Sequence, residues 1–105
     1  MDGIYLRIFT TEKQNHNGML LYEWLLEQAK AAGINGGSAL RSIAGYGRHK
    51  TLHEEAFFEL ASDLPVELVF VLTAEEPDKL LALIAAQGLS LVYFKSRVEW
   101  GLTGH

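Results

Sequence analysis

The residues with the clearest potential for chemistry lie together in the run SIAGYGRHKTLHEE, from residue 42 to residue 55. Gly45 and Gly47 allow the backbone to turn with its N–H groups exposed, and Arg48 and Lys50 add positive charge beside them. Exposed amides next to fixed cations suit an anion such as phosphate. The run therefore predicts either an anion site or a glycine-containing loop whose basic side chains face water.

The glycine spacing in this run differs from that of the phosphate-binding loop G-x-x-x-x-G-K-[ST], and no strand-to-helix context follows it. Arg41 lies upstream, on a predicted strand, and is either a surface charge or a further phosphate contact. His53 closes the set as a structural or ligand-contacting residue. The candidate ligand-binding residues of this region are Arg41, Gly45, Gly47, Arg48, Lys50 and His53.

Histidines and acids allow two other chemistries. His16, His49 and His53, with Glu54 as an oxygen ligand, are candidate ligands for a divalent metal, although H-E-x-x-H is absent. His53 with Glu55 is also an acid–base pair of the kind that a small hydrolase uses. The sequence contains no nucleophile elbow and no dinucleotide fingerprint, so we do not expect an enzyme.

Length and charge narrow the function classes. A chain of 105 residues predicts one domain, residues 1–105, and a net charge of -4 argues against a protein that coats nucleic acid. Since the chain has no cysteine, it is compatible with a reducing cytosol. The N-terminus carries charges unlike those of a signal peptide, and no apolar run approaches the roughly 20 residues of a membrane helix. We expect a cytoplasmic protein that does not insert into a membrane.

Periodicity predicts two helices. The first, residues 17–33, begins with Asn17 as its N-cap and ends at Gly33 after about four turns. The second, residues 75–88, has Pro77 in its first turn, where proline is tolerated, and stops at a glycine. Its inward-facing residues are expected to be Leu80, Leu81 and Ile84.

Four segments have the pattern of strands: residues 4–9, 38–47, 54–72 and 89–100. The third is interrupted at Pro65, which lacks a ladder donor and indicates an edge, a bulge or a kink. In the last, Tyr93, Lys95 and Arg97 share one face, because side chains alternate along a strand.

The predicted order is β-α-β-β-α-β, the order of ferredoxin-like folds, in which two helices cover one face of a four-stranded antiparallel sheet. The other face stays open. Tyr5, Phe9 and Tyr93 are expected there, and together they are too apolar to remain in water. The fold class is therefore α+β, and we expect an oligomer.

The order and spacing of several short motifs extend this picture from about residue 4 to about residue 98. They are Gly18 with Leu21, Tyr22 and Glu23, then Gly33, Gly37, Arg41, the Gly45-Tyr46-Gly47 turn, Leu52-His53, and Ser62-Asp63-Leu64-Pro65-Val66. With these residues in this order, the sequence resembles the bacterial PII-like family, which is still catalogued as a domain of unknown function.

The resemblance implies a ferredoxin-like subunit in a homotrimer, with ligand clefts between neighbouring subunits. In PII signalling proteins those clefts bind adenine nucleotides, here ATP, ADP or AMP. A long loop between the second and third strands then engages a membrane transporter or an enzyme, and residues 45–56 occupy that position. Family members often lie beside transporters, including fluoride-exporter-like channels, so a transporter or channel is the implied partner.

One departure from PII proteins affects the expected site. PII proteins hold phosphates with a glycine-rich, basic loop before the last strand, whereas residues 85–94, AAQGLSLVYF, supply only Gly88. Lys95 and Arg97 follow on the last strand, and we expect them to approach the ligand from the adjacent subunit. A divalent-metal-binding trimer resembling the cation-tolerance proteins is the alternative interpretation.

Overall fold

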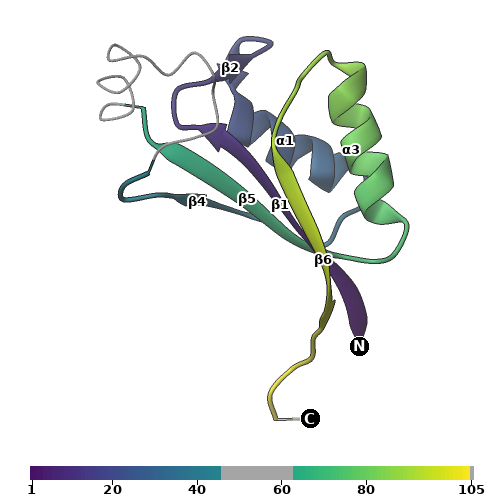
Figure 1. Ribbon diagram of the computed structural model, residues 1–105. Helices are drawn as coiled ribbons and strands as arrows, with labels where there is room; N and C mark the ends of the chain where they lie inside the picture. The colour runs from purple at the N-terminus through teal and green to yellow at the C-terminus, as the bar shows by residue number, and fades with distance from the viewer. Residues whose placement is uncertain (46–62, 105) are drawn as a thin grey trace.

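A four-stranded antiparallel sheet with two helices on one face forms the protein (Figure 1). The computed structural model describes residues 1–45 and 63–104. The sheet has the order β4-β5-β1-β6. Its strands are β1 (Asp2–Thr11), β4 (Ser38–Arg41), β5 (Pro65–Leu72) and β6 (Tyr93–Glu99), and the helices are α1 (Leu21–Ala31) and α3 (Glu76–Ala86). The ferredoxin-like order predicted from the sequence is confirmed.

Alternating side chains on the two central strands build the core. Leu6 and Ile8 of β1 lie opposite Phe70 and Leu68 of β5, and all four point toward the helices. Burying each such side chain contributes about 1.5–3 kcal/mol. The helices close this layer with their own buried residues, namely Leu21, Trp24, Leu25, Ala29, Leu80 and Ile84.

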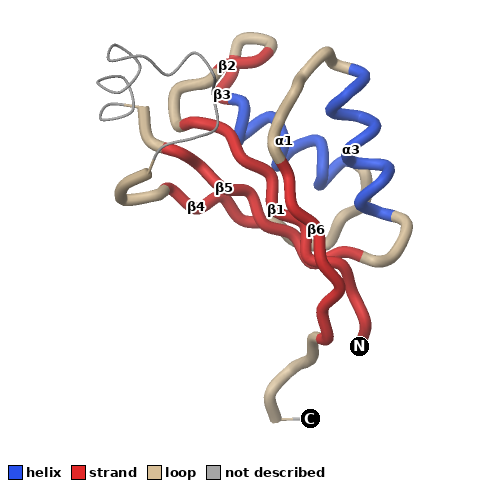
Figure 2. Tube along the Cα trace, in the orientation of Figure 1, coloured by secondary structure: helices blue, strands red, loops and turns tan. Residues whose placement is uncertain are grey.

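The first helix starts later than the sequence predicted. A small hairpin, β2 (Asn15–His16) and β3 (Met19–Leu20), precedes it (Figure 2). Asn17 is at the tip of this hairpin with φ 51°, so its predicted role as N-cap is wrong. Asparagine followed by glycine favours a two-residue hairpin turn with positive φ at both positions. The helix therefore has 11 residues, about three turns, and its C-terminal Gly33 has φ 86° as expected.

The second helix follows its prediction closely. Pro77 lies in its first turn, and Gly88 follows its end with φ 74°. Leu80 and Ile84 are buried, as expected, and Leu81 is half-buried against them.

Two strand predictions change in extent. β4 ends at Arg41, although the sequence pattern extended to residue 47. Pro65 is the first residue of β5, a central strand, so it marks neither an edge nor a kink within the strand. A first strand position tolerates proline. Residues 54–62, predicted to begin this strand, lie outside the described residues.

The sequence analysis placed Tyr93 of the last strand on the open face of the sheet, and this prediction is wrong. Tyr93 and Lys95 lie opposite Ile8 and Leu6, and residues directly opposite in an antiparallel pair share a face. Tyr93, Lys95 and Arg97 are thus on the helix-covered side of the sheet. Phe94, opposite Arg7, takes the place on the open side that we expected of Tyr93.

Across residues 1–45 and 63–104, neither helix is long and apolar enough to span a membrane.

Candidate functional site

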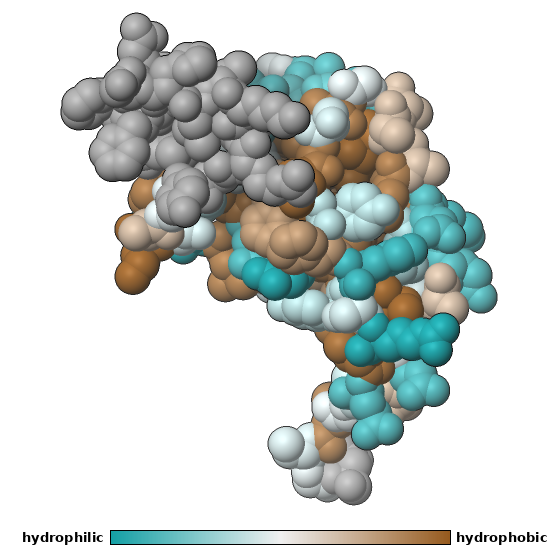
Figure 3. All heavy atoms as spheres, in the orientation of Figure 1, coloured by the Kyte–Doolittle hydropathy of each residue, from teal (hydrophilic) through white to brown (hydrophobic). Residues whose placement is uncertain are grey.

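The side of the sheet without helices carries an apolar surface, which we call the open face. Register places on it Tyr5, Arg7, Phe9, Leu40, Val69, Val71 and Phe94. Leu40 and Phe94 are 51% and 53% exposed, and Val71 is 47% exposed. In the space-filling view, hydrophobic surface shows between hydrophilic side chains over the strands (Figure 3). Large side chains in this number on one sheet face are typical of an association surface.

An ion pair lies in the middle of the open face. Arg7 Nε donates a hydrogen bond to a carboxylate oxygen of Glu67. The Arg7 guanidinium also lies 5.3 Å from the ring centroid of Phe9 and 5.5 Å from that of Phe94, within cation–π range. The hydrogen bond to Glu67 raises the pKa of Arg7, which stays charged. Because the two charges satisfy one another within one subunit, a partner can cover this face without meeting an unpaired ion.

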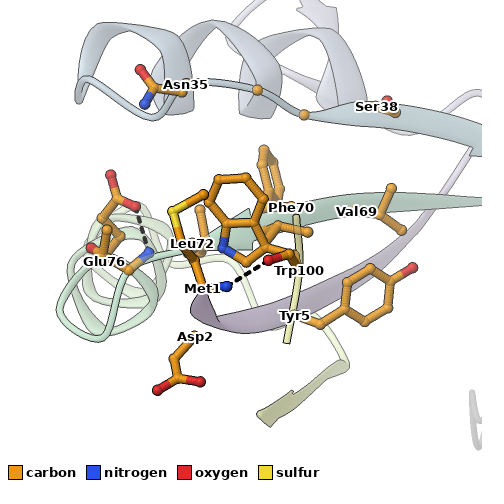
Figure 4. Close-up of a pocket in the computed structure, with 14 residues that line it drawn as sticks. Met1, Asp2, Tyr5, Asn35, Ser38, Val69, Phe70, Leu72, Glu76 and Trp100 are labelled. Atoms are coloured by element: carbon orange, nitrogen blue, oxygen red, sulfur yellow. Dashed lines mark hydrogen bonds between the residues drawn. The ribbon is translucent and has the colours of Figure 1, made fainter. Parts of the chain in front are cut away.

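A cavity of about 670 Å³ opens at one end of the sheet. It exists because β4 begins only at Ser38, opposite Val69, so residues 70–72 of β5 have no β4 neighbour. The segment Asn35 to Gly37 borders this gap on one side, and Trp100 covers it from the other (Figure 4). Two hydrogen bonds with Met1 fix the backbone of Trp100. The N-terminal nitrogen of Met1 donates to the carbonyl of Trp100 at 2.6 Å, and the N–H of Trp100 donates to the carbonyl of Met1 at 2.8 Å.

The lining of the cavity suits a flat, uncharged group. Trp100, Tyr5 and Phe70 supply aromatic surface, and Asn35 and Ser38 supply polar groups. The described residues that line it include the acids Asp2 and Glu76 and no lysine or arginine, and the N-terminal ammonium of Met1 donates to the carbonyl of Trp100. This lining thus offers a phosphate no basic side chain. Glu76 accepts a 2.8 Å hydrogen bond from the backbone N–H of Thr73, and in Figure 4 Asp2 points away from the indole.

Arg41 lies toward the other end of the sheet, where β4 stops. It lies opposite Val66, on the helix side, and its guanidinium is 3.3 Å from a carboxylate oxygen of Glu12. Gly45 is close by, because a Cβ placed on it would be 3.5 Å from the ring of Pro65. The structure thus brings Arg41 and Gly45 to the same end of the sheet.

Lys95 and Arg97 lie away from both of these residues, on β6 at the opposite edge. Lys95 is 3.4 Å from the carboxylate of Asp78 on α3. Arg97 is exposed and makes no ion pair within residues 1–45 and 63–104. Within one subunit, therefore, these two cations do not join Arg41 in a single site.

The remaining predicted site residues, Gly47, Arg48, Lys50 and His53, lie outside the described residues, as do His49, Glu54 and Glu55. His16, the described member of the metal alternative, packs edge-on to Trp24 with ring centroids 4.5 Å apart and is 3.1 Å from the side-chain oxygen of Gln87. In the described part of the chain, no three His, Asp or Glu side chains gather as metal ligands would.

Sequence reasoning missed the cavity. Its walls come from residues distant in the chain, such as Asn35 and Trp100, and none forms a motif. The paired glycines at 36 and 37 were the available signal: a Cβ on Gly37 would lie 2.4 Å from the Phe70 ring, so the segment passes unusually close to β5.

Comparisons with known proteins agree with this architecture. The family model DUF190, described as Uncharacterized ACR, matches residues 3–98. A UPF0166 protein of Aquifex aeolicus is 43% identical over 74 residues, which is 70% of this chain and 70% of that protein.

Solved structures of PII-like proteins share the fold. CPII of Thiomonas intermedia K12, bound to ADP, AMP and acetate, has a TM-score of 0.68 at 17% identity and covers 96% of this chain and 90% of its own. A protein of Thermus thermophilus described as a putative PII-like signaling protein has a TM-score of 0.63 at 15% identity, with 93% and 88% covered. The fold is thus that of PII-like proteins, and the match over residues 3–98 shows that the chain belongs to the DUF190 family.

Proposed function

We propose that this protein is a cytoplasmic, homotrimeric PII-like regulator that binds an adenine nucleotide in a cleft between subunits. In this proposal it acts on a membrane transporter or an enzyme through residues 45–56, and it is a regulator rather than an enzyme. The ADP and AMP bound to the structurally similar CPII support the choice of ligand class.

One observation carries the proposal: the cavity and the open face share residues. Tyr5, Val69 and Val71 belong to both, so a second copy packed on the open face would border the cavity. The cavity would then become part of a cleft between subunits. Its flat aromatic lining accepts a base, and its described residues offer no lysine or arginine side chain to the phosphates.

The phosphates would extend from the cavity toward basic residues. Arg41, Arg48 and Lys50, with the backbone of Gly45 and Gly47 and with His53, are the proposed contacts from one subunit. Lys95 and Arg97 are the proposed contacts from its neighbour. Lys95 would have to exchange its present partner, Asp78, for the ligand.

Isothermal titration calorimetry tests the ligand. The purified trimer, verified by light scattering, is titrated with ATP, ADP, AMP and cyclic nucleotides. We expect saturable heat with at least one of them and weaker binding by Arg48→Ala, by about 1.5–3 kcal/mol for a lost charge-assisted hydrogen bond. Absence of binding by an intact trimer would contradict the nucleotide assignment, and a monomer would contradict the assembly.

A further inference from the structure

Arg41 already has an anionic partner within its own subunit. Its guanidinium is 3.3 Å from a carboxylate oxygen of Glu12, a side chain that is only 32% exposed. Among the described residues, Arg41 is the candidate cation at the end of the sheet where the 42–64 connection begins. Any ligand that uses Arg41 must therefore compete with Glu12.

The backbone holds Glu12 in this position independently of its side chain. Its N–H donates to the carbonyl of Leu64 at 2.8 Å, and the next N–H, of Lys13, donates to the carboxylate of Asp63 at 2.7 Å. The N–H of Ser42, beside Arg41, donates to Pro65 at 2.9 Å. Because both residues are anchored to the same short segment, the backbone of Glu12 stays beside Arg41 when a ligand approaches, and only the Glu12 side chain has to give way.

We propose that Glu12 is a specificity-determining residue of the anion site: it competes with an anionic ligand for Arg41 and so weakens binding, most strongly for the ligand with the most negative charge. This inference rests on the proposed function, because it concerns the same nucleotide site. The carboxylate has two effects. It occupies the Arg41 donors, and its negative charge repels each additional charge on a phosphate chain.

The size of the effect follows from the exposure of the pair. Exposed ion pairs are weak, so removing the competitor should lower the Kd of an anionic ligand by about two- to fivefold. The gain should be larger for ATP than for AMP, since ATP carries more negative charge near Glu12. It should shrink as salt is raised from about 50 to about 500 mM, because exposed charges are screened. The uncharged adenosine, which occupies only the base position, should gain nothing.

The test compares Glu12→Gln with the wild-type protein by calorimetry, using adenosine, AMP, ADP and ATP. Glutamine has the same shape and leaves the backbone bond to Leu64 in place. Glu27→Gln on α1 is the matched control, because it removes an exposed acid that forms no ion pair with Arg41 in the described part of the chain. The Arg41→Gln variant and the Glu12→Gln/Arg41→Gln double variant complete a double-mutant cycle, which measures the coupling between Glu12 and Arg41.

We expect tighter binding of the three nucleotides by Glu12→Gln, no change by Glu27→Gln, and no gain from Glu12→Gln when Arg41 is already replaced. An unchanged nucleotide Kd in Glu12→Gln, an equal gain for adenosine, or an equal gain in the Arg41→Gln background would overturn the inference while leaving the proposed function intact. If the wild-type trimer binds none of the four ligands, the proposed function fails and this inference fails with it.

Discussion

Among the described glycines, Gly37 is the one at which an added side chain would meet the closest contact. A Cβ there would lie 2.4 and 2.6 Å from two ring carbons of Phe70, which is itself 2% exposed. A buried ring in a close-packed core cannot move aside without displacing its neighbours. Gly37 and Phe70 also line the cavity, so their close approach contributes both to the packing of the core and to the shape of the proposed base position.

We predict that Gly37→Ala lowers the free energy of unfolding by about 1–3 kcal/mol, because overpacking forces Phe70 or the backbone to shift. Urea denaturation at a fixed protein concentration measures it. Gly36→Ala is the matched control: a Cβ there has no atom within 4 Å, and we expect stability to be unchanged or slightly raised. Equal losses in the two variants would show that the contact with Phe70 is not the cause.

At the scale of elements, the turn before α1 decides where the helix starts. Asn17 and Gly18 both have positive φ, 51° and 81°, as a two-residue hairpin turn requires. The two possible roles of Asn17 make opposite demands. An N-cap accepts serine, whereas a left-handed turn position accepts glycine and disfavours serine.

We predict that Asn17→Ser destabilises the protein by about 1 kcal/mol, since serine tolerates a positive φ less well than asparagine does. Asn17→Gly should be close to neutral. Thermal unfolding followed by circular dichroism compares the two. If serine were neutral and glycine the more harmful, the helix would begin at Asn17 after all and the hairpin would be wrong.

The sequence predicted those elements in which one buried side gives the apolar residues a regular spacing. β1, β5 and both helices have one buried side, so their apolar residues recur at the spacing of that side. β6 has no such signal, because six of its seven residues are exposed. The alternation of side chains along a strand then shows which residues share a face, but it does not show whether that face is the open or the helix-covered one. Only the register with β1 shows that Phe94, and not Tyr93, lies on the open side. Pairing across the chain, as between Arg41 and Glu12, leaves no local pattern either.

At the scale of the whole molecule, the open face decides whether a cleft exists at all. Phe94 lies among the aromatic contacts of this face: its ring is edge-on to Phe9 with centroids 5.2 Å apart, and the Arg7 guanidinium covers both rings. Because this aromatic group stays half exposed in one subunit, its burial has to come from another copy if the protein is a trimer.

We predict that Phe94→Asp prevents assembly of the proposed trimer. A carboxylate buried there without a new partner would cost about 3–5 kcal/mol, which weakens association at least ~100-fold. Sedimentation equilibrium measures the mass, and Ala82→Asp, on the exposed side of α3, is the charge-matched control that should remain trimeric. The Phe94→Asp monomer should also lose nucleotide binding, since the cavity of one subunit has a base position but lacks the neighbour that completes the cleft. A monomer that binds nucleotide as tightly as the wild-type protein would place the whole site within one chain, and a trimer that survives Phe94→Asp would place the interface elsewhere.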